Sequence, residues 1–196
     1  MPTQSAPLRT NGTGVGDVFA SLYGQVSNVE LEELRTATVL KPIQRAALTL
    51  ISLGHTHRGA STLLGGRRHA VQNVLDGADK IMESGGRTPA LLHAVYRYPD
   101  YPLPLPRGTK AEQPPVLDEE ERAVLAAHAT GGTLLELAET LRCPARHLTA
   151  VNKRLLDKLA ARNAAHCVRR AWELAIYTRH NCPAAPAVVP VDLGRP

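Results

Sequence analysis

The most constraining feature of this chain of 196 residues is a pattern that occurs twice, at a constant offset of 77 residues. The first copy runs from Leu40 to Arg97 and the second from Leu117 to about Thr178. Without any gap, the identical positions include Leu40 and Leu117, Arg45 and Arg122, Leu48 and Leu125, Gly54 and Gly131, Thr56 and Thr133, Leu64 and Leu141, and Val74 and Val151. Because few other positions match, the pattern indicates one fold plan used twice rather than a recent copy.

The first copy has the hydrophobic spacing of four successive helices. Pro42 suits the first turn of a helix that ends at Gly54, and Thr56 is placed to cap a second helix. Residues 67–82 predict a third helix, and Thr88 is placed to cap a fourth.

The second copy repeats this order. Its first helix ends at Gly131, Thr133 caps the second, residues 144–159 predict the third, and residues 165–177 predict the fourth. Both copies therefore predict an all-α fold of two tandem four-helix domains, each containing a helix-turn-helix.

The segments outside the copies have a different composition. Prolines at positions 99, 102, 104 and 106 exclude a helix and favour an extended, semi-rigid spacer of ~3.1 Å per residue. The predicted organisation is an N-terminal extension over residues 1–39 with a disordered start and short helices, domain 1 over 40–97, a Pro-rich linker over 98–116, domain 2 over 117–178, and a Pro-rich C-terminal tail over 179–196.

The composition indicates aliphatic cores and a weak preference for polyanions. Apolar residues make up 43% of the chain, but Phe19, Trp172 and five tyrosines are the only aromatic residues. We expect Trp172 and Tyr177 in the core or at a dimer face. The net charge is +5; domain 1 has eight Lys and Arg against three Asp and Glu, and domain 2 has nine against eight. Domain 1 is therefore predicted to be the better phosphate-binding surface.

No feature predicts secretion or a membrane span. The three cysteines have no CxxC spacing, the N-terminus lacks an apolar signal core, and no stretch approaches ~18 apolar residues. We expect reduced thiols and a cytoplasmic, nucleoid-associated protein.

Each copy resembles the LuxR-type (GerE-like) helix-turn-helix domain of bacterial transcriptional regulators. That family opens roughly as L-T-P-x-E-x-x-V-L-x-L-x-A-x-G and continues with I-A-x-x-L-G and S-x-x-T-V-x-x-H-x-x-x-I-x-x-K-L. The first copy matches it at Leu40-Lys41-Pro42, Gly54, Leu64-Gly65 and Ala70-Val71. The second copy matches it at Leu117, Val124-Leu125, Gly131, Leu137-Ala138, Leu141, Leu148 and Lys158-Leu159. The resemblance covers about two thirds of the chain and implies double-stranded DNA as the partner.

Several residues depart from the family's pattern. Gly59 replaces an acidic residue, Arg67 replaces a serine, and Asn152 stands where an aliphatic residue is usual. Val74 and Val151 occupy the position of the family's histidine. We expect the fold to tolerate these changes, but not the same operator.

The resemblance implies that the third helix of each copy, the recognition helix, enters the major groove. It places base contacts at Gln72, Asn73 and Asp76 in the first copy, and at the unlike residues Thr149, Ala150 and Lys153 in the second. Cations around them would contact phosphates. The full set of predicted DNA-binding residues is Arg67, Arg68, His69, Gln72, Asn73, Asp76, Lys80, Arg146, Thr149, Ala150, Lys153, Arg154 and Lys158.

The sequence predicts no enzyme, no metal site and no cofactor. His55 and His57 lack carboxylate or thiolate partners at ligand spacing and are interpreted as solvent-facing. No nucleophile, base and orienting group can be assembled from the motifs.

Two questions of assembly and partner stay open at this stage. In related domains the fourth helix forms the dimer contact, so the two fourth helices pair either within one chain as a pseudo-dimer or between chains in a homodimer. The alternative to a DNA-binding regulator is an adaptor that binds RNA polymerase or another regulator through degenerate helix-turn-helix domains, or a promoter-binding protein like region 4 of sigma factors.

Overall fold

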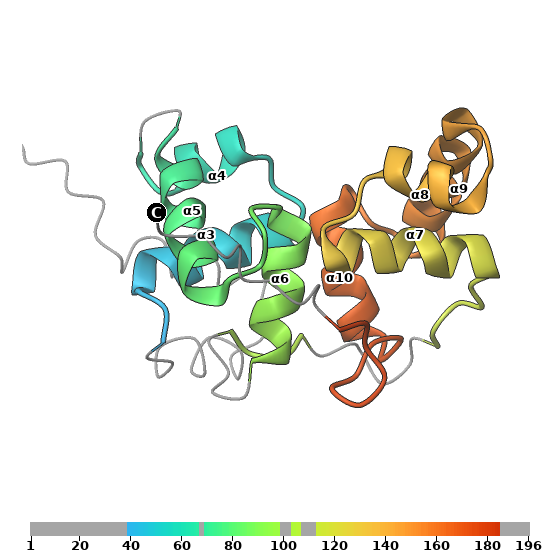
Figure 1. The fold of residues 1–196 in the computed structure, drawn as a ribbon. Coiled ribbons are helices and arrows are strands. Elements are labelled where there is room, and N and C mark those ends of the chain that lie inside the picture. Colours follow the sequence, from blue (N-terminus) through green and yellow to red (C-terminus); the bar gives the residue numbers. More distant parts are fainter. Residues whose placement is uncertain (1–38, 67–68, 99–102, 107–112, 185–196) are drawn as a thin grey trace, which may run out of the picture.

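The computed structural model describes residues 39–66, 69–98, 103–106 and 113–184, and their regular secondary structure is entirely helical (Figure 1). The prediction of an all-α chain is therefore confirmed for these residues. The helices are α3 (Pro42–Ser52), α4 (His57–Leu63), α5 (Ala70–Met82), α6 (Thr88–Arg97), α7 (Glu119–Thr130), α8 (Leu134–Leu141), α9 (Ala145–Lys158) and α10 (Ala164–Glu173).

The helix bounds repeat with the same offset as the sequence. Pro42 begins α3 and Glu119 begins α7, 77 residues later, and His57 and Leu134 begin α4 and α8 at the same interval. The other two pairs, α5 with α9 and α6 with α10, begin within two residues of it. The repeated apolar and capping positions thus correspond to repeated helices.

Local capping explains where several helices begin. The Thr56 side chain accepts a hydrogen bond from the Gly59 N–H at 3.1 Å, and the Thr133 side chain accepts one from the Glu136 N–H at 2.9 Å, so both predicted caps are confirmed. The cap predicted at Thr88 is wrong. Thr88 is the first residue of α6, and the cap position, Arg87, makes no side-chain capping bond. Proline in the first turn needs no N–H partner, which favours this start.

Two other predicted bounds differ from the structure. The third helix of the first copy was expected from Arg67, but α5 begins at Ala70, and Arg67 and Arg68 lie outside the described residues. The last helix was expected to reach Tyr177, but α10 ends at Glu173. Ala175 takes a left-handed φ of 56°, and the Tyr177 N–H then donates to the Ala171 carbonyl at 2.9 Å. The turn brings the Tyr177 ring back into the core, where it is buried.

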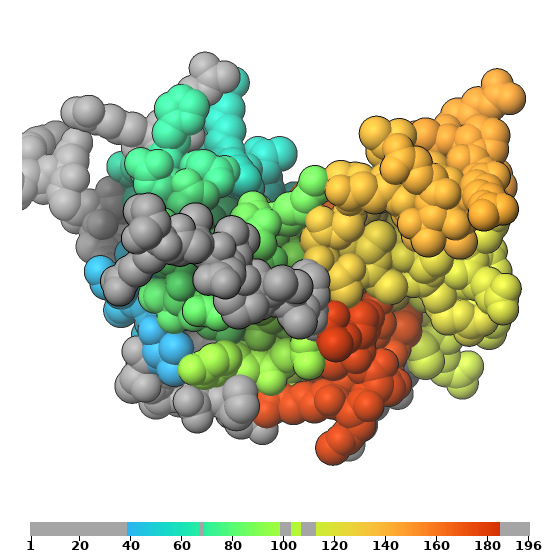
Figure 2. Space-filling model, viewed as in Figure 1, coloured from blue at the N-terminus to red at the C-terminus, as the bar shows by residue number. Residues whose placement is uncertain are grey.

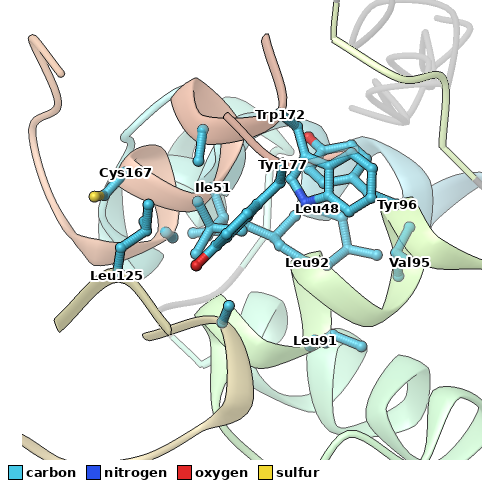
Figure 3. Close-up of a cluster of buried hydrophobic side chains, with 14 of the residues drawn as sticks. Leu48, Ile51, Leu91, Leu92, Val95, Tyr96, Leu125, Cys167, Trp172 and Tyr177 are labelled. Carbon is cyan, nitrogen blue, oxygen red and sulfur yellow. The ribbon is translucent and has the colours of Figure 1, made fainter. Parts of the chain in front are cut away.

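The helices of both copies share one continuous hydrophobic core. Helix α3 packs against α4 and α5, and α7 packs against α8 and α9. The two groups meet because α6 packs against α10 and α7, and α10 also contacts α3. Figure 3 shows the result: Leu92 and Tyr96 of α6 lie near Trp172 of α10, with Leu48 of α3, and Leu125 of α7 lies beside Cys167 of α10.

Aromatic and polar contacts join α6 to α10 and the segment after it. The rings of Tyr96 and Trp172 lie 5.9 Å apart between centroids. The Trp172 Nε1–H donates to His93 Nδ1 at 3.2 Å, and His93 Nε2 lies 3.0 Å from the Pro183 carbonyl oxygen. Burial lowers the pKa of His93 to about 4, so the ring is neutral and its Nε2–H donates to Pro183. The expectation for Trp172 and Tyr177 as core residues is confirmed.

Part of the Pro-rich segment lies against this core. Leu103 is 2% exposed and belongs to the core, and Pro104 and Pro106 are buried. Residues 99–102 and 107–112 lie outside the described residues.

The three cysteines form no disulfide, and burial raises the pKa of the Cys167 thiol to about 12. Within the described ranges, no helix combines the length and the apolar character that a membrane crossing requires.

Candidate nucleic-acid interface

Two helix pairs, α4–α5 and α8–α9, correspond to the predicted helix-turn-helix units. In Figure 1, α4 lies above α3, and α8 and α9 lie above α7. Figure 2 shows the lobes that contain them, with a hollow between the two lobes. Six residues separate α4 from α5 in the sequence and three separate α8 from α9, and each pair packs on the preceding helix, α3 or α7.

Helix α5 presents a polar face opposite its buried face. Val71, Leu75 and Ala78 are buried, whereas His69, just before the helix, and Asn73, Asp76 and Lys80 are exposed. This division follows from the 3.6-residue period. The half-buried Gln72 donates from Nε2 to Asp76 Oδ1 at 2.7 Å, so two of the predicted base contacts are bonded to each other.

Helix α9 presents a broader and more basic face. Four of the predicted contact residues are exposed on one side of it, opposite the buried Leu148, Val151 and Leu155: Arg146, Thr149, Ala150 and Lys153. The Thr149 hydroxyl donates to the Ala145 carbonyl at 3.1 Å and keeps its acceptor lone pairs available. No carboxylate of the described residues forms an ion pair with Arg146 or Lys153.

The remaining two predicted contacts, Arg154 and Lys158, lie on a flank of α9 that faces the start of α7. Lys158 Nζ lies 2.7 Å from Glu121 Oε2, and Arg154 lies 3.8 to 3.9 Å from carboxylate oxygens of Asp118, Glu120 and Glu121. On the same flank, His147 Nε2 lies 2.7 Å from Glu120 Oε1. Thus these two cations are already paired within the chain. We call the contact between these three carboxylates and these three basic side chains the ionic seam.

The ionic seam was not predicted from the sequence. Two of its carboxylates also cap α7: the Glu121 N–H donates to Asp118 Oδ1 at 2.8 Å, and the Asp118 N–H donates to Glu121 Oε2 at 3.0 Å. The paired residues of α7 and α9 are 27 to 37 positions apart in the sequence, beyond any local pattern. One signal was available, because the equivalent positions of Glu121 and Lys158 in the first copy are Gln44 and Ile81, which both lack charge.

One of the eight cations counted in the first copy is not on the surface. Arg45 is only 4% exposed and donates to the Leu40 carbonyl at 3.2 Å, and burial lowers the pKa of its guanidinium. On the described part of the α5 face, Lys80 stands with Asp76, whereas the α9 face carries Arg146 and Lys153. Domain 1 was predicted to carry the larger positive charge. At its third helix that charge depends on Arg67 and Arg68, which lie outside the described residues.

The polar residue in α9 where the family has an aliphatic one is accommodated by a partner. Asn152 Oδ1 lies 2.7 Å from His128 Nε2, which is the donor when the imidazole is neutral. Burial lowers the pKa of His128, and its hydrogen bond to Asn152 acts weakly in the opposite direction. Helix α9 is continuous through this position.

The histidines considered for a metal site are not fully solvent-facing. His55 and His57 are both partly buried, and His57 Nε2 lies 3.4 Å from the Thr88 hydroxyl. Burial, and then the charge of Arg162, lowers the pKa of His55. In the part of the chain that the structure describes, no three His, Cys, Asp or Glu side chains gather as metal ligands would.

Comparisons with protein-family models, curated proteins and solved structures found no match to this chain.

Proposed function

We propose that this protein is a sequence-specific, double-stranded DNA-binding transcriptional regulator of a bacterium, with two LuxR-like helix-turn-helix modules. The observation that carries the proposal is the repetition of a short helix followed by a longer one, α4–α5 and α8–α9, each with an exposed polar face on the second helix. A helix of this width fits the major groove, where base edges differ in their donors and acceptors.

The two recognition helices offer different base contacts. Asn73 on α5 can form a bidentate pair with adenine, and Asp76 can accept from cytosine once its bond to Gln72 opens. On α9, Lys153 can donate to guanine O6 and N7, and the methyl group of Ala150 can contact thymine. The proposal therefore includes an asymmetric site with two unlike halves.

The packing of α6 against α10 supports an intrachain pseudo-dimer over a homodimer. With the fourth helices in contact inside one chain, both recognition helices belong to one compact unit. Half-sites of such paired modules lie about one helical turn apart, ~34 Å. A protein with this function acts in the cytoplasm, at the nucleoid, and needs no cofactor for binding.

Salt-dependent binding to duplex DNA tests the proposal. Genomic fragments are selected with the full chain, the bound site is footprinted, and affinity is measured against salt. Replacing both arginines, Arg67→Ala with Arg68→Ala, should flatten the log–log salt slope by about 1.8, since each phosphate contact contributes about 0.9. Lys41→Ala with Arg122→Ala removes the same charge from two exposed residues outside the recognition helices and should change the slope less.

The same assay separates the two halves. Lys153→Ala should relax selectivity in one half of the footprint and leave the other half unchanged. No duplex binding by the native chain, even in dilute buffer, would reject the proposal.

One observation favours the adaptor as a second candidate. Helix α8 carries two leucines in solvent, Leu135 at 61% and Leu141 at 44% exposure. Exposed apolar side chains on a helix are common contacts for a protein partner such as RNA polymerase. Two results together would favour this function. The native chain would bind RNA polymerase but not duplex DNA, and the double variant Leu135→Gln with Leu141→Gln would lose the binding to polymerase.

A further inference from the structure

The ionic seam contains two kinds of ion pair. The Glu121 side chain is fully buried, and its 2.7 Å contact with Lys158 compensates a charge inside the fold. The side chains of Asp118, Glu120 and Arg154 are each about half exposed, and Arg154 lies 3.8 Å from an oxygen of each carboxylate. Apart from this contact, Asp118 caps α7 and Glu120 lies 2.7 Å from His147. Exposed pairs at 3.8 Å contribute little stability, so folding does not explain the contacts of Arg154 with these two carboxylates.

In the proposed complex, the flank of α9 that carries Arg154 faces the sugar-phosphate backbone beside the groove. Arg154 follows Lys153 in sequence, and one residue along a helix turns the side chain by about 100°. With Lys153 directed to the base edges, Arg154 lies on the flank, beside the phosphates that border the groove. A DNA phosphate at this position would compete with Asp118 and Glu120 for the guanidinium of Arg154.

We propose that Asp118 and Glu120 weaken the sequence-independent part of DNA binding by competing with DNA phosphates for Arg154. This inference rests on the proposed function and assigns a role within it to two residues that contact no base. The competition weakens backbone binding, which is the same for every sequence. Retention on DNA then depends more on base contacts from Thr149 and Lys153 on the neighbouring face.

The competition has a consequence for salt dependence. A free arginine that binds a phosphate releases a counterion condensed on the DNA, which steepens the salt slope. When the phosphate displaces a carboxylate, the freed carboxylate takes up cations from solution, so the net release is smaller. Removing the carboxylates should therefore strengthen non-specific binding and steepen its salt slope together.

The test uses the full chain, a random-sequence duplex and the footprinted site. Glu120→Gln should tighten binding to the random duplex and to the footprinted site, each about threefold, because the phosphate contact is common to both. Asp118→Asn with Glu120→Gln should do so more strongly and steepen the salt slope by up to about 0.9. Asparagine also caps helices, so the start of α7 is retained, which thermal unfolding of the variants verifies.

Glu119→Gln is the matched control. Glu119 is the neighbour of both residues, is exposed, carries the same charge and makes no ion pair among the described residues. The proposal expects a change for Glu120→Gln that clearly exceeds that for Glu119→Gln. Equal effects of the two variants, or no effect of either, would overturn it. If the native chain also fails to bind duplex DNA, the proposed function is rejected, and this inference with it.

Discussion

The two copies form the same helix contact with different chemistry. In the second copy, Glu121 at the start of α7 is buried and faces Lys158 of α9. In the first copy, Gln44 is also buried at the start of α3, but Ile81 takes the place of the lysine and is 45% exposed. Gln44 and Glu121 make the same capping bond, accepting from the N–H three residues earlier at 2.9 and 3.0 Å.

This comparison separates what the fold needs from what the charge adds. The fold needs a side-chain acceptor at position 44 or 121 to complete the cap. The carboxylate adds a buried charge, which then requires a cation on the opposite helix. An amide needs no such cation, so α5 has an isoleucine there and α9 a lysine. Both changes occur together, as expected for residues in contact.

The largest difference between the copies should appear in the shared core. Trp172 of α10 and Val95 of α6 occupy equivalent positions, and both are buried. Trp172→Ala should lower the free energy of unfolding by about 4 kcal/mol and Val95→Ala by about 2 kcal/mol, because the cavity and the lost apolar area are larger for tryptophan. Urea unfolding followed by circular dichroism measures both. Similar losses for the two variants would show that the core does not depend on α10 more than on α6.

The next effect concerns pH and the contact between α6 and α10. The unfolded chain protonates His93 near its ordinary pKa of 6.5, whereas burial holds the folded pKa at about 4. The unfolded state therefore binds more protons in this range, and stability falls as pH falls from 6.5 to 4, by about 3 kcal/mol in total. His166, with its pKa lowered to about 4 by burial and by Arg169, Arg162 and Arg170, acts in the same direction.

Urea unfolding between pH 7 and pH 4 checks this effect. In His93→Gln, which keeps a polar side chain at the site, the loss should be smaller by about 3 kcal/mol, with the contribution of His166 remaining. A pH profile identical to that of the native chain would mean that the buried imidazole titrates normally.

The smallest of the three effects tests the seam directly. Lys158→Ala leaves the buried Glu121 carboxylate with the Asp118 N–H and with the distant Arg154 as its cation. The change should cost about 2 kcal/mol, less than for a fully buried pair because Lys158 is partly exposed. The double variant Glu121→Gln with Lys158→Ile gives the second copy the residues that the first copy has at these positions, and it should recover most of that loss. A double-mutant cycle from thermal unfolding measures the coupling between the two residues. Additive losses would contradict the compensation of Glu121 by Lys158.

What the sequence predicted well was local. The caps at Thr56 and Thr133 depend on neighbours within one turn, and both were found. The early end of α10 was missed, because the turn that follows it is selected by the burial of Tyr177 rather than by a glycine.

The contacts that were not predicted depend on how helices cross. Arg154 and Lys158 were assigned to DNA because they lie on a basic helix, and only the packing of α9 on α7 places them against carboxylates. In the same way, Arg45 counted as a surface charge until the packing around α3 buried it. Net charge per segment is thus a poor measure of the charge that a partner meets.

The contact between α6 and α10 joins two halves of a single polypeptide. It has no association constant, so the paired arrangement does not depend on the amount of protein in the cell. In a homodimer every substitution appears twice, once in each subunit. Here a substitution in one half leaves the other unchanged, and the two halves are free to diverge independently.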